Sequence, residues 1–252
     1  MSDTRIADVR VTPIAFYDPP LLNNAGCHEA FALRSIIEVE TEDGVIGLGE
    51  SYGTKPVLDG LAALAPKMVG LDVTDLNGLW VRGREAVQGD MEGYTGKEGL
   101  LPRVVGAIEV AMWDAYGKAT NRRVCDLLGG QVRETVPFSA YLFYKFGKHI
   151  EEPKPDVWGE ALTPEGLVDQ ARRMFDLYGF NAIKLKAGVL PPDEEIAGLE
   201  ALRAAFPNAP LRIDPNGGWG VQTTIDLLSR LTGLIEYLED PTPGISGMAQ
   251  VQ

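Results

Sequence analysis

Four charged side chains end three short apolar segments in the second half of the chain. Lys184 and Lys186 end the segment 182–186, Asp214 ends the next, and Glu239 ends the one after. The two lysines lie two positions apart, so on a strand their side chains leave the same face. Ammonium groups that share one space oppose each other's charge, which lowers one pKa and predicts a neutral lysine base near pH 7. Taken alone, such a pair is more often two surface lysines whose ammonium groups reach water.

The two carboxylates extend this prediction from a base to a metal-assisted site. Asp214 alone fits turn chemistry, because Pro215, Asn216 and Gly217 follow it, and Glu239 alone fits a carboxylate facing water at a strand end. Together with the lysines they occupy the ends of consecutive segments, where parallel barrels keep their catalytic groups. Two hard carboxylates suit Mg²⁺ with open positions for an anionic substrate. A metal beside a lysine favours removal of a proton α to a carboxylate, with the metal stabilising the enediolate.

The first half of the chain predicts an α+β domain over residues 1–134. Alternating residues from Ile6 onward indicate a strand, and two further alternating runs, 35–42 and 45–50, flank an Asp-Gly dipeptide typical of a tight hairpin turn. Helical spacing follows at 56–69, 75–87 and 104–119. Strands followed by helices, without alternation between them, favour the α+β class.

From residue 135 to 252 the pattern alternates between strands and helices. The predicted strands are 136–144, 182–186, 211–214 and 235–239. One predicted helix ends at residue 178, and two others cover 193–206 and 221–231. Such alternation predicts a parallel sheet with right-handed crossovers. A complete barrel needs about 200–250 residues. We therefore expect the first half of a (β/α) barrel of the TIM type, with about four of its eight βα units and unpaired outer strand edges.

Composition excludes several other classes of protein. The formal net charge of −13 opposes binding to nucleic acid or to anionic membranes. The chain contains no run of 18 apolar residues and begins without an apolar signal region, which predicts a cytoplasmic protein. Cys27 and Cys125 fit no metal or redox spacing, which predicts reduced thiols.

The site motifs resemble those of the enolase superfamily, in its mandelate racemase-like branch. The motifs that carry the resemblance are Lys184-Leu185-Lys186, Asp214-Pro215-Asn216 and Glu239-Asp240-Pro241. Within that branch the chain is most similar to glucarate dehydratases, through residues 178–181, 184–190 and 214–219. The resemblance implies a capping domain before a modified barrel, a Mg²⁺ cofactor, an acid-sugar diacid substrate and a homo-oligomeric full-length protein.

The resemblance also implies roles for individual residues. Lys186 would be the base and Lys184 the neighbour that tunes it, while Asp214 and Glu239 would bind Mg²⁺ beside Asn216 as a polar support. Four further residues match positions that contact substrate in the family: Asn23, His28, Tyr141 and Phe143. Each also has a structural explanation, since Asn23 fits a turn, His28 a hydrogen-bonded loop, and the two aromatic residues core packing.

The implied reaction is proton removal next to a carboxylate, followed by loss of water to give a keto-deoxy sugar acid. Ala187-Gly188 and Thr242-Pro243 depart from the usual Gly-Gly and Cys-Gly of the family. The third metal ligand and a His-Asp pair would come from strands after Glu239, so we expect the isolated chain to be nearly inactive. A racemase, a cycloisomerase and a non-catalytic fragment remain alternatives.

Overall fold

The computed structural model describes residues 3–87, 99–152 and 154–252, and it forms two compact units. The first unit contains residues 1–16 and 31–134, and the second contains 17–30 and 135–252. By its contacts the segment 17–30, which lies within the range 1–134 predicted for the first domain, clusters with the second unit. Its backbone pairs with residues that follow the first strand of the second unit, as described below.

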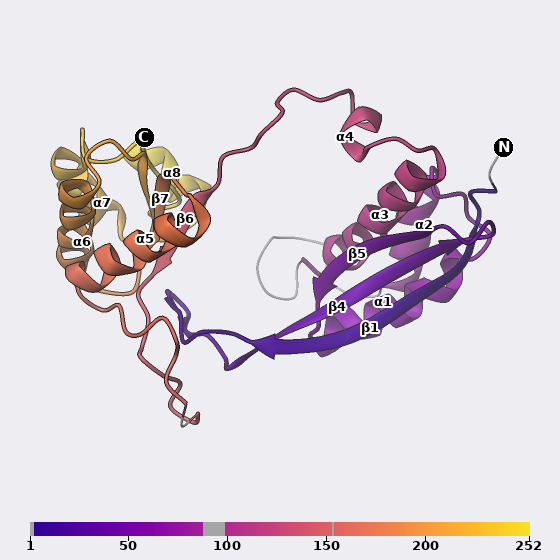
Figure 1. Cartoon of the computed structure of the whole chain (residues 1–252), viewed down its shortest axis with the longest axis horizontal. Helices are drawn as coiled ribbons and strands as arrows, with labels where there is room; N and C mark the ends of the chain where they lie inside the picture. The colour runs from indigo at the N-terminus through magenta and orange to yellow at the C-terminus, as the bar shows by residue number, and fades with distance from the viewer. Residues whose placement is uncertain (1–2, 88–98, 153) are drawn as a thin grey trace. The chain divides into compact units, whose positions relative to one another are not determined.

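The first unit is a three-stranded sheet with helices packed on one face (Figure 1). The sheet has the order β1-β4-β5, and its elements are β1 (Ile6–Tyr17), β4 (Phe31–Thr41) and β5 (Ile46–Tyr52). The helices are α1 (Lys55–Met68), α2 (Leu76–Ala86), α3 (Leu100–Ala119) and α4 (Val124–Leu127). β4 and β5 pair antiparallel around Asp43-Gly44, and Gly44 has the positive φ of 77° that such a turn requires. The predicted α+β class is confirmed.

Close contact between β5 and α3 holds this unit together. Gly47 and Gly49 face the helix, and a Cβ at these positions would lie 2.0 and 2.1 Å from carbonyl oxygens of α3. Only glycine allows the helix backbone to approach the strand this closely. The core between sheet and helices contains fully buried side chains from every layer, including Ile37, Leu64 and Ile108.

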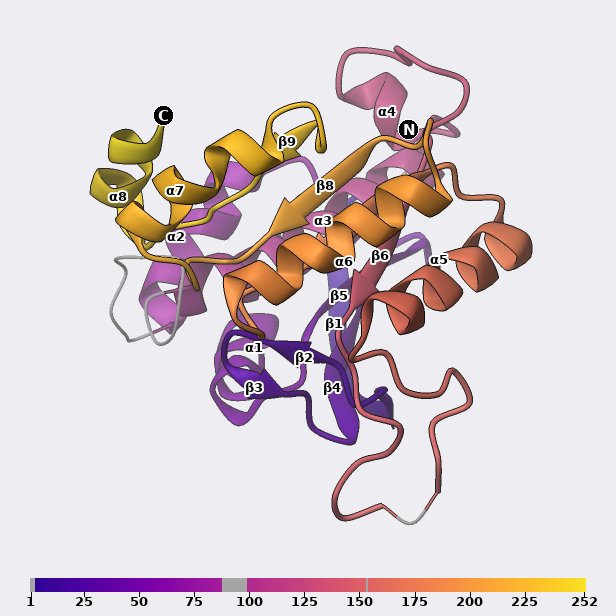
Figure 2. The same ribbon diagram turned by 90° about the vertical axis from the view of Figure 1, so that its left-hand side faces the viewer.

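The second unit is a four-stranded parallel sheet whose strands alternate with helices. In chain order its main elements are β6 (Ser139–Phe143), α5 (Pro164–Tyr178), β7 (Ala182–Lys186), α6 (Pro192–Ala205), β8 (Leu211–Asp214), α7 (Val221–Leu231), β9 (Tyr237–Leu238) and α8 (Gly244–Val251). The sheet order β6-β7-β8-β9 follows the sequence, and each neighbouring pair is parallel. Figure 2 shows α5 and α6 side by side over these strands. This is the predicted partial barrel.

Helix α5 illustrates why these helices begin and end where they do. Thr163 caps its first turn by accepting a hydrogen bond from the Gly166 N–H at 3.2 Å, and Pro164 occupies the first helical position. Gly179 ends the helix in the left-handed conformation with φ 68°. These short-range signals set the length of the crossover between β6 and β7.

Two predicted strands are longer than the observed ones. The segment predicted from residue 136 begins only at Ser139, because Val136 and Phe138 are exposed and pair with no neighbouring strand. The strand predicted at 235–239 is reduced to Tyr237 and Leu238. In the described part of the chain, none of the helices has both the length and the apolar character needed to cross a membrane.

The segment 17–30 of the second unit contains a small hairpin. It consists of β2 (Leu22–Asn23) and β3 (Gly26–Cys27), which pair antiparallel. The Leu22 N–H donates to the Tyr144 carbonyl at 2.8 Å, and the Phe146 N–H donates to the Pro20 carbonyl at 3.1 Å. These bonds attach the hairpin to the chain that leaves β6.

Candidate active site

The charged residues singled out by the sequence meet at the carboxyl ends of β7, β8 and β9. Lys186 lies opposite Asp214 in the parallel register of β7 and β8. Lys184 lies two residues earlier on the same strand, and Glu239 directly follows β9. Ile183 and Leu185 of β7 fill the core on the helix side of the sheet. Side chains alternate along a strand, so Lys184 and Lys186 point to the opposite face, away from the helices. Strand pairing therefore gathers the four side chains at one edge.

The two carboxylates share the ammonium group of Lys184. Its Nζ lies 2.7 Å from Glu239 Oε2 and 3.1 Å from Asp214 Oδ2. Lys186 Nζ contacts the same Asp214 oxygen at 3.0 Å. Asp214 is 2% exposed and Lys186 is 7% exposed, whereas the Glu239 side chain is 37% exposed. The site therefore has a buried lysine–aspartate part and an open side at Glu239.

The carboxylates determine the protonation of Lys184. Burial lowers the pKa of Lys184, but its hydrogen bonds to Glu239 and Asp214 raise it by more, and the net pKa lies above the ordinary value for lysine. Lys184 is therefore not the lysine whose pKa is lowered, and the prediction of one lowered pKa stays a prediction. Its ammonium forms two ion pairs, and these attractions exceed the repulsion that the sequence spacing suggested.

Asn216 and its turn support the buried end of this cluster. Asn216 Oδ1 accepts from Lys186 Nζ at 2.5 Å, and the Asn216 N–H donates to Asp214 Oδ1 at 3.0 Å. Asn216 has a positive φ of 53°, a conformation that asparagine tolerates better than most residues. The backbone of Gly188 lies directly against this turn. A Cβ added at Gly188 would lie only 2.2 Å from the Pro215 carbonyl oxygen. Glycine is therefore required at position 188, while Ala187 fits in the core.

The two aromatic residues of β6 line the same face of the sheet as the lysines. Tyr141 is opposite Lys184 and Phe143 is opposite Lys186 in the register of β6 and β7. Lys184 Nζ lies 5.1 Å from the centroid of the Tyr141 ring, within the range of a cation–π contact. Tyr141 is 39% exposed, and neither ring belongs to the core cluster of the second unit. Both rings therefore lie on the face of the sheet that carries the lysines, outside the core cluster of this unit.

The β2–β3 hairpin brings Asn23 and His28 to the side of Phe143. The rings of His28 and Phe143 meet edge to face with centroids 5.9 Å apart. Both nitrogens of His28 have partners, Asp18 Oδ2 at 2.9 Å and Asn23 Nδ2 at 3.0 Å. A hydrogen bond of 2.6 Å from Asn24 Nδ2 to the Asn216 carbonyl links the hairpin to the lysine–carboxylate cluster.

Several polar residues around the site were not identified from the sequence. The Gln170 side chain pairs with both backbone groups of Phe143, accepting from N–H at 3.1 Å and donating to C=O at 3.2 Å. The Lys145 ammonium forms an ion pair with Asp156, and both side chains are 2% exposed. A local sequence pattern could not identify these residues, because their partners are remote in the chain. Gln170 bonds Phe143 from 27 positions away, and Lys145 pairs with Asp156 from 11 positions away. A hollow of about 230 Å³ lies beside them, lined mainly by apolar and aromatic side chains.

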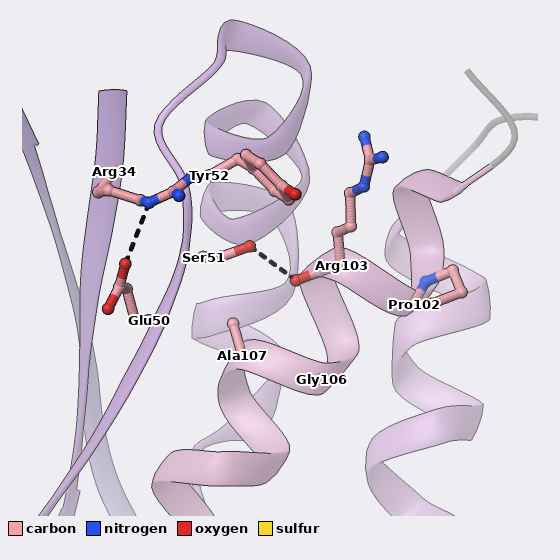
Figure 3. A pocket seen from close by; sticks show the side chains of 8 residues that line it. All are labelled: Arg34, Glu50, Ser51, Tyr52, Pro102, Arg103, Gly106 and Ala107. Atoms are coloured by element: carbon pink, nitrogen blue, oxygen red, sulfur yellow. Dashed lines mark hydrogen bonds and ion pairs between the residues drawn. The ribbon is translucent and has the colours of Figure 1, made fainter. Parts of the chain in front are cut away.

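The first unit has a hollow of its own, of about 360 Å³, at the end of β5 (Figure 3). The Tyr52 ring lies between two guanidinium groups, with the carbon of Arg34 at 4.8 Å and that of Arg103 at 4.9 Å from its centroid. Arg34 also pairs with Glu50 at 3.1 Å. The side chains lining this hollow include no lysine beside paired carboxylates. The lysine–carboxylate cluster described above lies in the second unit.

The fold and the site together define a class of protein: an α+β unit joined to parallel βα units whose strand ends carry a lysine pair and two carboxylates. Two family models match the sequence, the N-terminal domain of mandelate racemase and muconate lactonizing enzyme over residues 18–129 and the enolase C-terminal domain-like family over residues 166–252. The chain belongs to the enolase superfamily, in the mandelate racemase and muconate lactonizing enzyme group. The predicted family is confirmed.

The chain is similar to proteins that are named as dehydratases and cycloisomerases. It is 46% identical to a probable glucarate dehydratase of Streptomyces coelicolor, over 99% of this chain and 61% of that protein. It is 29% identical to a D-galactarolactone cycloisomerase of Agrobacterium fabrum, over 82% of this chain and 50% of that protein. An enolase structure from Pseudomonas fluorescens with bound magnesium, potassium and tartrate is 47% identical, with a TM-score of 0.94, over 100% of this chain and 61% of the other. The chain thus spans about 60% of the length of the most similar of these proteins.

Proposed function

We propose that this chain carries the base and two metal ligands of an acid-sugar dehydratase similar to glucarate dehydratase. The reaction is removal of the proton α to a carboxylate, followed by loss of the β-hydroxyl as water to give a keto-deoxy sugar acid. One observation carries the proposal: Lys186, Asp214 and Glu239 lie at adjacent strand ends, joined by ion pairs of Lys184 and Lys186. The likeness to a probable glucarate dehydratase supports a hydroxy-diacid substrate.

The donor groups fit Mg²⁺. Asp214 and Glu239 supply carboxylate oxygens, the ligands this ion prefers, from neighbouring strands. Both carboxylates already converge on a single positive charge, the Lys184 ammonium, with N–O distances of 2.7 and 3.1 Å. Among the residues that the structure describes, no group of three His, Cys, Asp or Glu side chains is arranged to hold a metal, so the chain would provide two ligands. When bound, the ion supplies positive charge that stabilises the enediolate.

The residues of the chain divide the remaining work. Lys186 Nζ would take the α-proton, and its bonds to Asp214 and Asn216 hold it at the ends of β7 and β8. Lys184 would place positive charge beside the substrate carboxylate. Tyr141 would act as a hydrogen-bond donor, because the pKa of its hydroxyl lies above the usual value for tyrosine. Burial raises this pKa most, the Lys184 ammonium lowers it, and the Asp214 carboxylate raises it again.

The proposal is tested in the protein that carries the complete barrel. Keto acid formation from glucarate in the presence of Mg²⁺ is measured for Lys186→Met and for Arg230→Met, whose guanidinium pairs with Asp193 and Glu200 on the helical side. Removing the base should lower kcat by about 100-fold to 10,000-fold, whereas Arg230→Met should retain the parent rate. A Lys186→Met enzyme within tenfold of the parent would overturn the assignment.

Proton NMR of the products in D₂O separates the alternatives within the family. A dehydratase gives a keto-deoxy acid, a racemase gives an epimer with all hydroxyl groups retained, and a cycloisomerase interconverts ring and open forms. The chain of 252 residues is assayed in parallel, and we expect no turnover from it because two metal ligands bind Mg²⁺ weakly. Dehydration by this chain alone, at a rate typical of enzymes, would contradict that expectation.

A further inference from the structure

A single buried carboxylate, that of Glu195, joins the loop that follows β7 to the turn that follows β8. Glu195 Oε1 accepts from the backbone N–H groups of Val189 and Leu190, at 2.8 and 3.1 Å. Glu195 Oε2 accepts from the indole N–H of Trp219 at 2.8 Å. Glu195 is 0% exposed and Trp219 is 3% exposed. Both carboxylate oxygens are therefore used inside the protein, and they hold two segments that directly follow strands of the site.

Hydrogen bonds and the start of a helix offset the burial of this charge. A buried ionised carboxylate is costly unless polar groups surround it. Three N–H donors bind Glu195, and it lies in the first turn of α6, where the helix dipole favours negative charge. The two acidic residues before it, Asp193 and Glu194, are exposed. Of this acidic run only the third residue is buried, so its contacts are specific to position 195.

Backbone hydrogen bonds extend the connection from the β8 turn to the end of β9. The Trp219 N–H donates to the Pro241 carbonyl at 2.9 Å, and the Gly217 N–H donates to the Asp240 carbonyl at 2.6 Å. Asp240 directly follows Glu239 in the chain. The β8 turn thus contacts the segment that carries Glu239, and the carboxylate on α6 holds that turn through the Trp219 side chain.

We propose that Glu195 is a positioning residue that fixes the spacing between the base Lys186 and the carboxylates of Asp214 and Glu239. The inference rests on the proposed function for the roles of these three residues. The hydrogen bonds of Glu195 go to other residues, so it acts through the loops that follow the three strands. The spacing matters because a displacement of about 1 Å can cost about 100-fold in rate. Mg²⁺ in addition demands ligands in near-ideal octahedral geometry.

The first test places Glu195→Gln and Trp219→Phe in the protein that carries the complete barrel. Gln keeps the size of the side chain, but its NH₂ group must face an N–H donor on one side, and Phe removes the indole donor. Each variant should lower kcat about 10-fold to 100-fold and weaken Mg²⁺ binding, measured by calorimetry, about 10-fold. The double variant should lose no more than the larger single loss, because both changes break the same link. Glu194→Gln, at the exposed neighbour on α6, should leave both values unchanged.

A purely structural role for Glu195 gives a different result. The variants would then melt at a lower temperature, while the folded enzyme kept the parent kcat and the parent Mg²⁺ affinity. Values within twofold of the parent in Trp219→Phe or in folded Glu195→Gln would overturn the proposal. Losses that add in the double variant would overturn the link between the two side chains.

A second test needs neither metal nor turnover. Amide hydrogen exchange of Gly217 and Trp219 is measured by NMR in the 252-residue chain, since their N–H groups bond the segment after β9. Exchange at both amides should be faster in Glu195→Gln and unchanged in Glu194→Gln. Unchanged exchange in Glu195→Gln would overturn the connection between Glu195 and the end of β9. Failure to dehydrate glucarate would count against the proposed function, whereas exchange and Mg²⁺ affinity test the positioning separately.

Discussion

Replacing Asp156 by Asn should strongly destabilise the second unit, because it would leave the Lys145 ammonium buried without a counter-charge. The two side chains are each 2% exposed and form a direct ion pair. The Lys145 backbone also pairs with Ala161 in both directions, at 3.1 and 3.0 Å, and forms a bridge to Leu21. The ion pair therefore supports the chain on which the β2–β3 hairpin rests.

The expected loss follows from the burial of the pair. Breaking a buried ion pair by removing one charge costs about 3–5 kcal/mol in the free energy of unfolding. Asn retains an oxygen that can accept the Trp158 N–H, which now bonds Asp156 at 2.9 Å, so the net contribution of that bond, about 1 kcal/mol, is preserved. Asp156→Ala should lose this amount in addition.

The assay is urea unfolding of the 252-residue chain, followed by circular dichroism and tryptophan fluorescence. The double variant Lys145→Met with Asp156→Leu removes both charges and should lie near or above the parent stability. Asp59→Asn is a surface control, since Lys55 and Asp59 form an exposed pair with side chains 84% and 63% exposed, worth about 0.5 kcal/mol or less. An Asp156→Asn variant within 1 kcal/mol of the parent, or a double variant as unstable as the single one, would refute the reasoning.

Three further changes test the packing and electrostatics of other elements. Gly49→Ala should destabilise the first unit by about 1–3 kcal/mol or more, because its Cβ would lie 2.1 Å from a carbonyl oxygen of α3, whereas Gly106→Ala in open space on that helix should not reduce the melting temperature. Hydrogen bonds from threonine side chains lower the pKa of Asp72, so its contribution to stability is present above the unfolded-state pKa and lost as the pH falls through the folded value. Asp72→Asn should therefore be less stable than the parent at pH 7 and converge with it in acid unfolding experiments below about pH 4. Gln170→Met should speed amide exchange of Phe143 and cost about 1–3 kcal/mol, since both backbone groups lose their partner; unchanged exchange would show that water replaces the glutamine.

Most elements of the fold could be predicted from the sequence because their signals are local. Alternating residues around Asp43-Gly44 specified the hairpin, and the positive φ at Gly44 is the physical reason that glycine stands there. The alternation of strands and helices after residue 135 predicted a parallel sheet, which the structure confirms. Lys184 and Lys186 had to leave one face of their strand, since side chains alternate along a strand whatever its neighbours are.

The environment of each site residue depended on tertiary contacts. Nothing near Lys184 in the sequence shows that Glu239, 55 positions away, would form an ion pair with it, and that contact raises its pKa. Asp18 similarly meets His149 from 131 positions away. Strand register brings such residues together, and register results from the packing of the whole sheet.

The sequence by itself therefore determined which residue types stand at the strand ends, because strand period and strand–helix alternation are written in short stretches of chain. Tertiary structure alone decided how those residues interact: which charges pair, which side chains are buried, and that residues 17–30 cluster with the second unit. Charge, burial and hydrogen-bond direction depend on distances of a few ångströms between remote segments. Local patterns contain no information on those distances until the chain has folded.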